Sequence, residues 1–328
     1  MPSQFKLPII DVSPFTTDSS DSNSQTAKLE VARQIHDACR NVGFFYLIGH
    51  NVPQEIIDKT LKLGYEFFHL PEEEKINYSI TKQDNARGYQ RLGEGVTKYQ
   101  RDWNEALDFY KPVPRTHPLA LKKLPIGGEN QWPENPSELR AVFSEYKDYM
   151  LKLGAQVMNA IALSLGLEEN FFDKFLDDCF WVMRISGYPD LRNAVGIDRV
   201  GVSLGEHTDY GLLTFLNQDD TKGALQVQTA DGDWINADPL PGAFVVNICD
   251  MLNIWTNNLY KSTLHRVIHK GDRYRVTVPF FYEPNYNARI EPLEACLKID
   301  PVKHHEPVVF GEHLLNKVSG NFEITESY

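Results

Sequence analysis

The sequence has 328 residues, of which 42% are hydrophobic and 12% aromatic, enough to bury one large core. The net charge of -12 argues against a broad nucleic-acid-binding face, because phosphate binding needs a basic surface. The four cysteines lie far apart and form no C-x-x-C motif, which is typical of free thiols in a reducing compartment. No stretch approaches the roughly 18 apolar residues of a membrane span, and the N-terminus lacks a secretory or transit pattern. We therefore expect a cytoplasmic protein that does not bind membranes, with entry into the nucleus left open.

The first third of the chain predicts helices around short apolar strands. A β-branched run at 7–15 is followed by a polar loop at 16–26 that is rich in Ser and Asp. Apolar residues then recur at steps of three and four, which predicts an amphipathic helix over 26–42. The aromatic run GFFYLIGH at 43–50 indicates a strand, and a second helix is expected from Pro53 onward. This region is predicted to be helix-rich.

The predicted secondary structure changes twice in the rest of the chain. Six prolines within 111–136 predict an irregular connection, and 137–165 then shows a long helical pattern that ends at Gly166. After Phe180 the sequence breaks into seven short β-rich segments: WVMRISGYP, LLTFL, ALQVQT, DWINA, AFVVNI, STLHRVIHK and RYRVTVPFFY. Such segments, separated by turn residues, predict a double-sheet barrel of the jelly-roll kind. The expected fold class is α+β with a mainly β core and a long supporting helix.

Two polar residues, His207 and Asp209, interrupt the apolar stretch LGEHTDYGLLTFL at 204–216. On a strand, side chains at i and i+2 share one face, so this H-x-D offers an imidazole and a carboxylate to one point. A buried carboxylate is costly unless it is paired, hydrogen-bonded or bound to a metal. His265, in STLHRVIH, supplies a third ligand. Two His and one carboxylate with open positions are the ligand set of non-haem Fe(II) oxygenases.

A chelating co-substrate such as 2-oxoglutarate needs a cation for its far carboxylate. Arg275 and Thr277 offer a guanidinium and a hydroxyl at i and i+2. A hairpin turn at Gly271 and Asp272 would place His265 opposite Val278. Three residues, or roughly 10 Å at about 3.3 Å per residue, would then separate the levels of the iron ligand and the arginine. A five-carbon diacid fits that span.

Five segments of the β-rich half, HTDYGLLTFL, GALQVQ, AFVVNICDML, KSTLHRVIH and RYRVTVPFF, resemble one known family, as do PIIDVSPF and GFFYLIGHNV near the N-terminus. This family is the Fe(II)/2-oxoglutarate-dependent dioxygenase superfamily in its isopenicillin N synthase-like branch, and the resemblance runs from about residue 7 to about residue 315. It implies a distorted double-stranded β-helix with a helical N-terminal region. It also implies the site residues: His207, Asp209 and His265 for iron, and Arg275, Thr277 and Tyr188 for 2-oxoglutarate.

The resemblance also suggests weaker candidates and shows departures from the family pattern. The stretch at 87–95 borders the substrate pocket in the family, so Arg87 and Tyr89 are candidates for substrate contact, and Phe281 shares the strand face of Arg275. Thr277 stands where the family often has Ser, which keeps the hydroxyl. The roles of Ser186, where many plant members have Asn, and of Cys249, where Gly is common, stay open.

From these features we expect four parts: 1–118 as a helix-rich N-terminal region, 119–178 as connection and supporting helices, 179–288 as the catalytic double-stranded β-helix, and 289–328 as a C-terminal extension that packs on the core. No heptad pattern stands out, so a monomer is expected.

The implied activity is oxidation of a small organic substrate by O2, as hydroxylation, desaturation or ring closure. 2-Oxoglutarate is the co-substrate, succinate and CO2 are released, and ascorbate is an expected stimulant. Two alternatives stay open at this point. One is an iron-dependent oxidase that does not use 2-oxoglutarate, because Arg275 does not settle the co-substrate: an R-x-S motif can bind other carboxylates. The other is a non-catalytic sensor, although an intact triad argues against it. The primary substrate cannot be read from the sequence, because loops and helices determine it without a general code.

Overall fold

The computed structural model describes residues 6–17, 22–80, 86–97, 100–114, 116, 127–191 and 203–320. Its first half contains β1 (Ile9–Asp11), α1 (Ser13–Thr16), α2 (Ser22–Asn41), β2 (Phe44–Ile48), α3 (Gln54–Phe68), α4 (Glu72–Lys75), η1 (Ile76–Tyr78), β3 (Gly88–Gln90), β4 (Val96–Thr97), β5 (Gln100–Arg101), β6 (Glu105–Tyr110) and α6 (Leu139–Ser164). Its second half contains η3 (Asp173–Phe175), β7 (Cys179–Tyr188), β8 (Leu204–His207), β9 (Leu213–Gln218), β10 (Leu225–Gln228), β11 (Trp234–Asn236), β12 (Phe244–Ile248), α7 (Asp250–Trp255), β13 (His265–Val267), β14 (Arg275–Asn285), β15 (Arg289–Ile290), α8 (Glu294–Leu297), β16 (Val308–Val309) and α9 (Phe310–Gly320).

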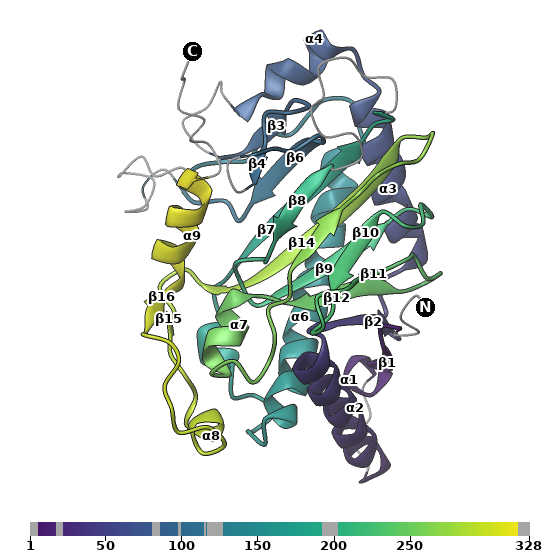
Figure 1. The fold of residues 1–328 in the computed structure, drawn as a ribbon. Helices are drawn as coiled ribbons and strands as arrows, with labels where there is room; N and C mark the ends of the chain where they lie inside the picture. Colours follow the sequence, from purple (N-terminus) through teal and green to yellow (C-terminus); the bar gives the residue numbers. More distant parts are fainter. Residues whose placement is uncertain are drawn as a thin grey trace.

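Two sheets, in which most strand pairs are antiparallel, form the β core (Figure 1). The larger sheet has eight strands in the order β1-β2-β12-β9-β14-β7-β6-β3, and the smaller has four in the order β11-β10-β13-β8. Strands from the N-terminal region therefore extend both sides of the larger sheet, β1 and β2 on one side and β6 and β3 on the other. This is the double-sheet jelly roll expected from the sequence.

The long strand β14 lies in the middle of the larger sheet and presents different residues to its two faces. Its even-numbered positions face the helices: the Cα of Gly154 in α6 packs directly against the ring of Tyr282, and Gly64 in α3 packs against Val276. Both positions favour glycine, because an added Cβ would lie 2.2 Å from the Tyr282 ring at Gly154, and 2.7 Å from Ile185 and 3.0 Å from Val276 at Gly64. The odd-numbered positions line the cavity on the opposite face.

The helices and strands expected in the first half are present with small shifts of their ends. Helix α2 begins at Ser22 rather than near Thr26, and Gly43, at φ +70°, ends the segment by donating to the carbonyl of Ala38 at 2.9 Å. The long helix spans Leu139–Ser164. In the polar loop at 16–26, residues 18–21 lie outside the described residues, as do Pro118 and Pro125 of the proline-rich connection.

The hairpin expected around Gly271 and Asp272 is wrong. β13 pairs with β10 and β8 in the smaller sheet, whereas β14 lies between β9 and β7 in the larger sheet. The chain therefore crosses from one sheet to the other between Val267 and Arg275. β13 and β14 therefore do not pair with each other. They belong to opposite sheets, as consecutive strands of a jelly roll can.

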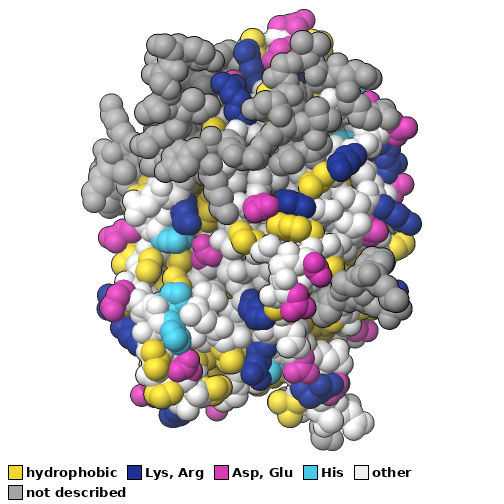
Figure 2. Space-filling model, viewed as in Figure 1, with side chains coloured by type: hydrophobic (Ala, Val, Ile, Leu, Met, Phe, Trp, Pro, Cys, Tyr) yellow, Lys and Arg dark blue, Asp and Glu magenta, His cyan; other side chains and the backbone are white. Residues whose placement is uncertain are grey.

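No helix in the described part of the chain is long and apolar enough to cross a membrane. On the face that Figure 2 shows, basic and acidic side chains are interspersed among the coloured residues.

Candidate metal centre and co-substrate pocket

Three side chains converge between the two sheets. His207 is the last residue of β8, His265 is the first residue of β13, and the two are directly paired in the smaller sheet. The Nε2 atoms of both histidines lie 3.7 Å from Oδ1 of Asp209. The ligand atoms of the three residues all lie within 4.8 Å of one another, which is close enough to share one metal ion.

Asp209 lies beyond the end of β8, so the i, i+2 strand argument that predicted its position is wrong in detail. The chain leaves the strand after His207 and turns before β9. The backbone carbonyl of Asp209 accepts from the N–H of Asp250 at 2.9 Å, which fixes the turn against the start of α7. The turn, rather than the strand, brings the buried carboxylate to the two imidazoles.

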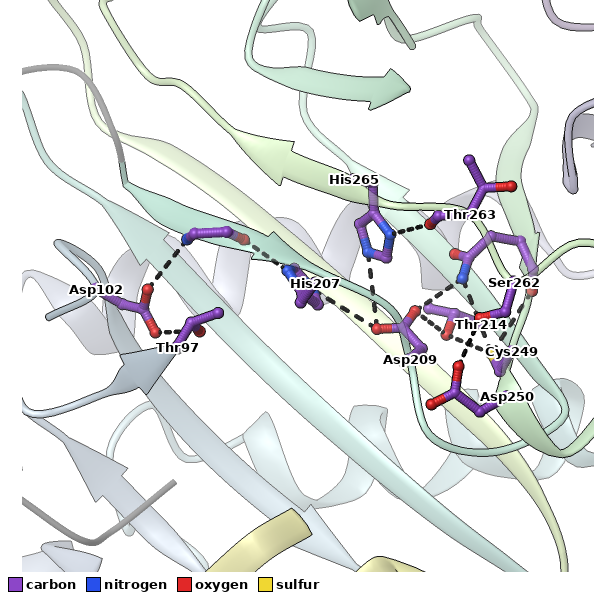
Figure 3. A network of polar contacts seen from close by, with 12 residues as sticks. Thr97, Asp102, His207, Asp209, Thr214, Cys249, Asp250, Ser262, Thr263 and His265 are labelled. Carbon is purple, nitrogen blue, oxygen red and sulfur yellow. Dashed lines mark hydrogen bonds and ion pairs between the residues drawn. The ribbon is translucent and has the colours of Figure 1, made fainter. Parts of the chain in front are cut away.

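Backbone carbonyls determine which nitrogen each histidine offers (Figure 3). Nδ1 of His207 lies 2.7 Å from the carbonyl of Gly205, and Nδ1 of His265 lies 3.1 Å from the carbonyl of Thr263. A carbonyl oxygen only accepts, so each Nδ1 carries the proton and donates it. Each Nε2 is then left with a lone pair directed toward Asp209, as a metal ligand requires.

Asp209 is held through its other oxygen. Oδ2 accepts from Oγ1 of Thr214 at 2.6 Å and from Nδ2 of Asn247 at 2.8 Å, which leaves Oδ1 to face the histidines. Burial opposes ionisation of this carboxyl group. The neighbouring imidazoles and the two hydrogen bonds nevertheless hold the pKa of Asp209 below its usual value. Sγ of Cys249 lies 3.4 Å from Oγ1 of Thr214, so the position left open in the sequence packs behind the carboxylate.

His207 lies in surroundings that favour its neutral form. Burial, and then the neighbouring His265, lower the pKa of His207 to about 4. At neutral pH His207 is therefore deprotonated at Nε2, and no proton must leave before a metal binds. Two imidazole nitrogens and one carboxylate oxygen suit a first-row divalent metal such as Fe(II). The donor set therefore fits the implied iron.

Arg275, the first residue of β14, is 1% exposed and lines the same cavity as the triad. Its guanidinium carbon lies 4.8 Å from the ring centroid of Tyr188, and Nη2 donates to Oε1 of Gln218 at 3.1 Å. Nε and Nη1 are buried without an acceptor in the described part of the chain. Buried donors without partners are costly, so this guanidinium suits a carboxylate ligand.

The other residues predicted for 2-oxoglutarate lie beside Arg275. Thr277 is buried two positions along β14, and the neighbouring strand β7 places Tyr188 opposite Arg275 and Ser186 opposite Thr277. All four line the cavity, and so does Phe281. Ser186, the position at which Asn is common in plant members of the family, therefore lies on the same cavity wall as Thr277.

The structure does not bring Arg87 and Tyr89 to this cavity. Arg87 is fully buried, where Nε donates to Asn130 at 3.1 Å and Nη2 to the carbonyl of Lys111 at 2.8 Å. Tyr89 donates to Oε2 of Glu105 at 2.6 Å. In the strand β3 that contains Tyr89, the next residue, Gln90, lines the cavity instead.

The cavity wall includes residues that the sequence analysis missed. Asp102, Asp108 and Glu283 add carboxyl groups, Arg184 adds a guanidinium, and Leu314 and Val318 of α9 add an apolar edge. The place of Glu283 in the cavity wall could have been predicted from the sequence, because Glu283 shares the odd-numbered face of β14 with Arg275 and Thr277. Asp102 and α9 carry no such signal in the sequence.

Two family models match the chain. One is described as the 2OG-Fe(II) oxygenase superfamily and matches residues 182–284; the other, described as the non-haem dioxygenase in morphine synthesis N-terminal, matches residues 7–135. The chain belongs to the 2OG-Fe(II) oxygenase superfamily. It is an Fe(II)- and 2-oxoglutarate-dependent dioxygenase that uses O2 to oxidise a small organic substrate.

Relatives of known activity match almost the whole chain. The chain is 44% identical to the Arabidopsis thaliana homoarginine-6-hydroxylase 2-ODD-C23.1, over 98% of this chain and 99% of the relative. It is 42% identical to a homoarginine-6-hydroxylase of Glycine max, over 96% of this chain and 97% of that protein. Among solved structures, JOX2 in complex with 2OG, Fe and JA is 29% identical with a TM-score of 0.76, over 94% of this chain and 84% of that chain.

Proposed function

We propose that His207, Asp209 and His265 bind the iron, and that Arg275 and Thr277, with Tyr188, bind the distal carboxylate of 2-oxoglutarate. The observation that carries this proposal is the convergence of two Nε2 atoms on Oδ1 of Asp209 at 3.7 Å. When bound, iron and 2-oxoglutarate supply the oxidation of a C–H bond by O2, with release of succinate and CO2. The protein's own part is to hold the carboxylate and imidazoles in place and to exclude water.

Anaerobic titration of the Fe(II)-loaded protein with 2-oxoglutarate tests this assignment. Chelation of iron by a keto acid gives a weak visible absorption band, which we expect in the wild-type protein. Asp209→Ala removes a ligand and leaves the histidines paired to backbone carbonyls, so we expect a folded protein without the band and without activity. Unimpaired turnover by Asp209→Ala would remove this metal site.

We propose that the primary substrate is homoarginine or a closely similar guanidino amino acid, hydroxylated at a carbon atom. In this reaction 2-oxoglutarate, O2 and R–H yield succinate, CO2 and R–OH. The support is that four relatives, 42–44% identical over at least 96% of this chain, are homoarginine-6-hydroxylases. A second support is that Asp102 and Glu283 add carboxyl groups to the cavity lining beyond the ion pair of Asp108 with Arg184, which suits a cationic guest.

Succinate release with a panel of amino acids tests the substrate. We expect homoarginine to stimulate succinate formation above the rate without substrate and to yield a product heavier by one oxygen atom. Arginine, which is shorter by one methylene, should stimulate less. Stimulation by uncharged substrates with none by guanidino amino acids would show that the substrate class is wrong.

We further propose that the chain acts as a cytoplasmic monomer of the isopenicillin N synthase-like branch, without a nucleic-acid or membrane partner. The four cysteines are unpaired, as expected in a reducing compartment, and the net charge is -12. Light scattering of the purified protein tests the monomer: a mass of twice 37.6 kDa would contradict it.

A further inference from the structure

One wall of the cavity holds a carboxyl group that no described cation pairs with, that of Glu283. Building on the proposed homoarginine hydroxylation, we propose that Glu283 is a specificity-determining residue: it binds the guanidinium of the substrate and so places the adjacent carbon beside the metal centre. The side chain is 3% exposed, and Oε2 has no hydrogen-bond partner in the described part of the chain.

The position of Glu283 on β14 places it near the triad and away from the 2-oxoglutarate end. Arg275, Thr277, Pro279, Phe281 and Glu283 all line the cavity from one face of this strand. Phe281 pairs with Thr214, whose hydroxyl donates to Asp209. Glu283 is the next residue on that face beyond the level of the triad, at the end opposite Arg275. A substrate on Glu283 and 2-oxoglutarate on Arg275 would therefore lie at opposite ends of one strand, with the three candidate ligands between them.

The backbone after Asp209 makes room for this carboxyl group. Oε2 of Glu283 lies 1.2 Å from the position that a Cβ on Gly211 would take. Any side chain at this position would therefore displace the carboxyl group. Because Gly211 follows Asp209 by two residues, the carboxyl group lies against the same turn that carries the metal-facing aspartate.

The other cavity acids already have partners. Asp108 accepts from Nε and Nη2 of Arg184, each at 2.7 Å, which neutralises both groups. Asp102 accepts from Oγ1 of Thr97 at 2.7 Å and from the N–H of Gly205 at 3.1 Å. Among the described carboxyl groups that line the cavity, apart from Asp209, Glu283 is thus the one with a buried oxygen that lacks a hydrogen-bond partner.

A guanidinium is the ligand that matches this feature. It is planar and always charged, and it presents paired N–H donors to a carboxylate. A buried carboxyl group costs free energy as an anion unless a cation pairs with it, so Glu283 should favour a charged guest over a neutral one of the same shape. In homoarginine the guanidino nitrogen is bonded to carbon 6. A guanidinium on Glu283 therefore brings carbon 6 to the side of the cavity that holds the triad.

The test compares two ligands on two proteins by anaerobic calorimetry, with Fe(II) and 2-oxoglutarate already bound. One ligand is homoarginine and the other is homocitrulline, which replaces the guanidinium with a neutral urea of nearly equal shape. We expect wild-type protein to bind homoarginine at least tenfold more tightly than homocitrulline. E283Q keeps the side-chain volume and removes the charge, so we expect it to bind homoarginine at least tenfold more weakly and homocitrulline within about twofold of wild type. The exposed Glu306→Gln is the matched control and should change neither affinity.

The outcomes separate this inference from the proposed function. An E283Q protein that keeps its preference for homoarginine overturns the role of Glu283 alone. A wild-type protein that forms the 2-oxoglutarate band but binds no guanidino amino acid overturns the proposed substrate and this inference together. Loss of the band in E283Q would assign Glu283 a structural role and overturn the inference. Should E283Q fail to fold, Glu283→Asp is the second variant: it keeps the charge and should keep the preference for homoarginine over homocitrulline. The wild-type protein alone is also a test, because equal binding of the two ligands would overturn the inference.

Discussion

Arg275 is a buried cation whose surroundings leave two of its donors without acceptors in the described structure. Burial lowers its pKa, which reflects the cost of keeping the charge inside the protein. We expect Arg275→Ala to weaken 2-oxoglutarate binding by about 2–5 kcal/mol, the loss typical of a buried charge-assisted pair. The anaerobic titration measures it. The nearby Arg273 is half exposed and pairs with Asp220, so Arg273→Ala is the control; equal effects of both variants would mean that the co-substrate pocket is misassigned.

His50 is a buried histidine whose hydrogen bonds define its protonation state, and it predicts how the stability of the protein depends on pH. Its Nδ1 accepts from the N–H of Val52 at 3.2 Å and its Nε2 donates to the carbonyl of Gly242 at 3.1 Å, so the ring is neutral. Burial lowers its pKa below the ordinary value. As the pH falls below about 6.5, the unfolded chain gains this proton first and the free energy of unfolding decreases by up to about 1.4 kcal/mol per pH unit.

Urea unfolding of wild-type protein and His50→Gln at pH 7, 6 and 5 measures this contribution. The variant lacks the titrating ring, so its stability should decrease less over this range. Equal decreases in both proteins would show that His50 does not contribute, and that the acid sensitivity comes from other titrating groups.

At the residue scale, the sequence predicted the residue types of the site better than their surroundings. The H-x-D motif, His265 and the R-x-T motif could be predicted because their spacing and chemistry are specific. Thr214 and Asn247, which hold Asp209, could not be predicted, because they come from β9 and β12 and meet only when the strands pair. The prediction of Arg87 and Tyr89 fails because the pleat of this stretch turns Gln90, rather than Tyr89, toward the cavity.

Among the elements, α6 and β14 approach each other at Gly154. Glycine to alanine inside a helix ordinarily stabilises a protein by about 0.5–1 kcal/mol. Here the added methyl group would meet the buried Tyr282 ring at 2.2 Å. We therefore expect Gly154→Ala to destabilise the protein by about 1–3 kcal/mol, the usual cost of overpacking. Urea unfolding measures the change, and a stabilised variant would contradict the close packing of α6 on the sheet.

The elements themselves were predictable where the hydrophobic period was strong, as in α2, α3 and α6. The pairing of β13 was not, because consecutive β-rich segments joined by Gly271 and Asp272 have the local signature of a hairpin. In a jelly roll, consecutive strands can belong to different sheets. The information that separates them lies in long-range packing, which a turn motif does not contain.

In the whole molecule, the candidate metal centre joins the two sheets. His207 and His265 belong to the smaller sheet, whereas the partners of Asp209 are Thr214 and Asn247 of the larger sheet. Metal binding should therefore stabilise the entire fold. With a metal ion present at 100 times its dissociation constant, we expect about 2.7 kcal/mol of added stability, seen as a rise of several degrees in the melting temperature. Chelator should reverse the rise, and Asp209→Ala should show none; a rise in that variant would place the ion elsewhere.

The hydrogen bonds between β6 and β7 join the N-terminal region to the catalytic sheet, with Leu107 opposite Ile185 in the register. The two family models match on either side of this seam, at residues 7–135 and 182–284. Expressing the second segment alone would remove β6 together with residues 179–181 of β7, and would leave the rest of β7 with an open edge. Such an edge is a template for intermolecular pairing. For dissection or recombination of this enzyme with its relatives, the sheet is the smallest transferable unit, and a boundary drawn between the two matches would produce aggregates.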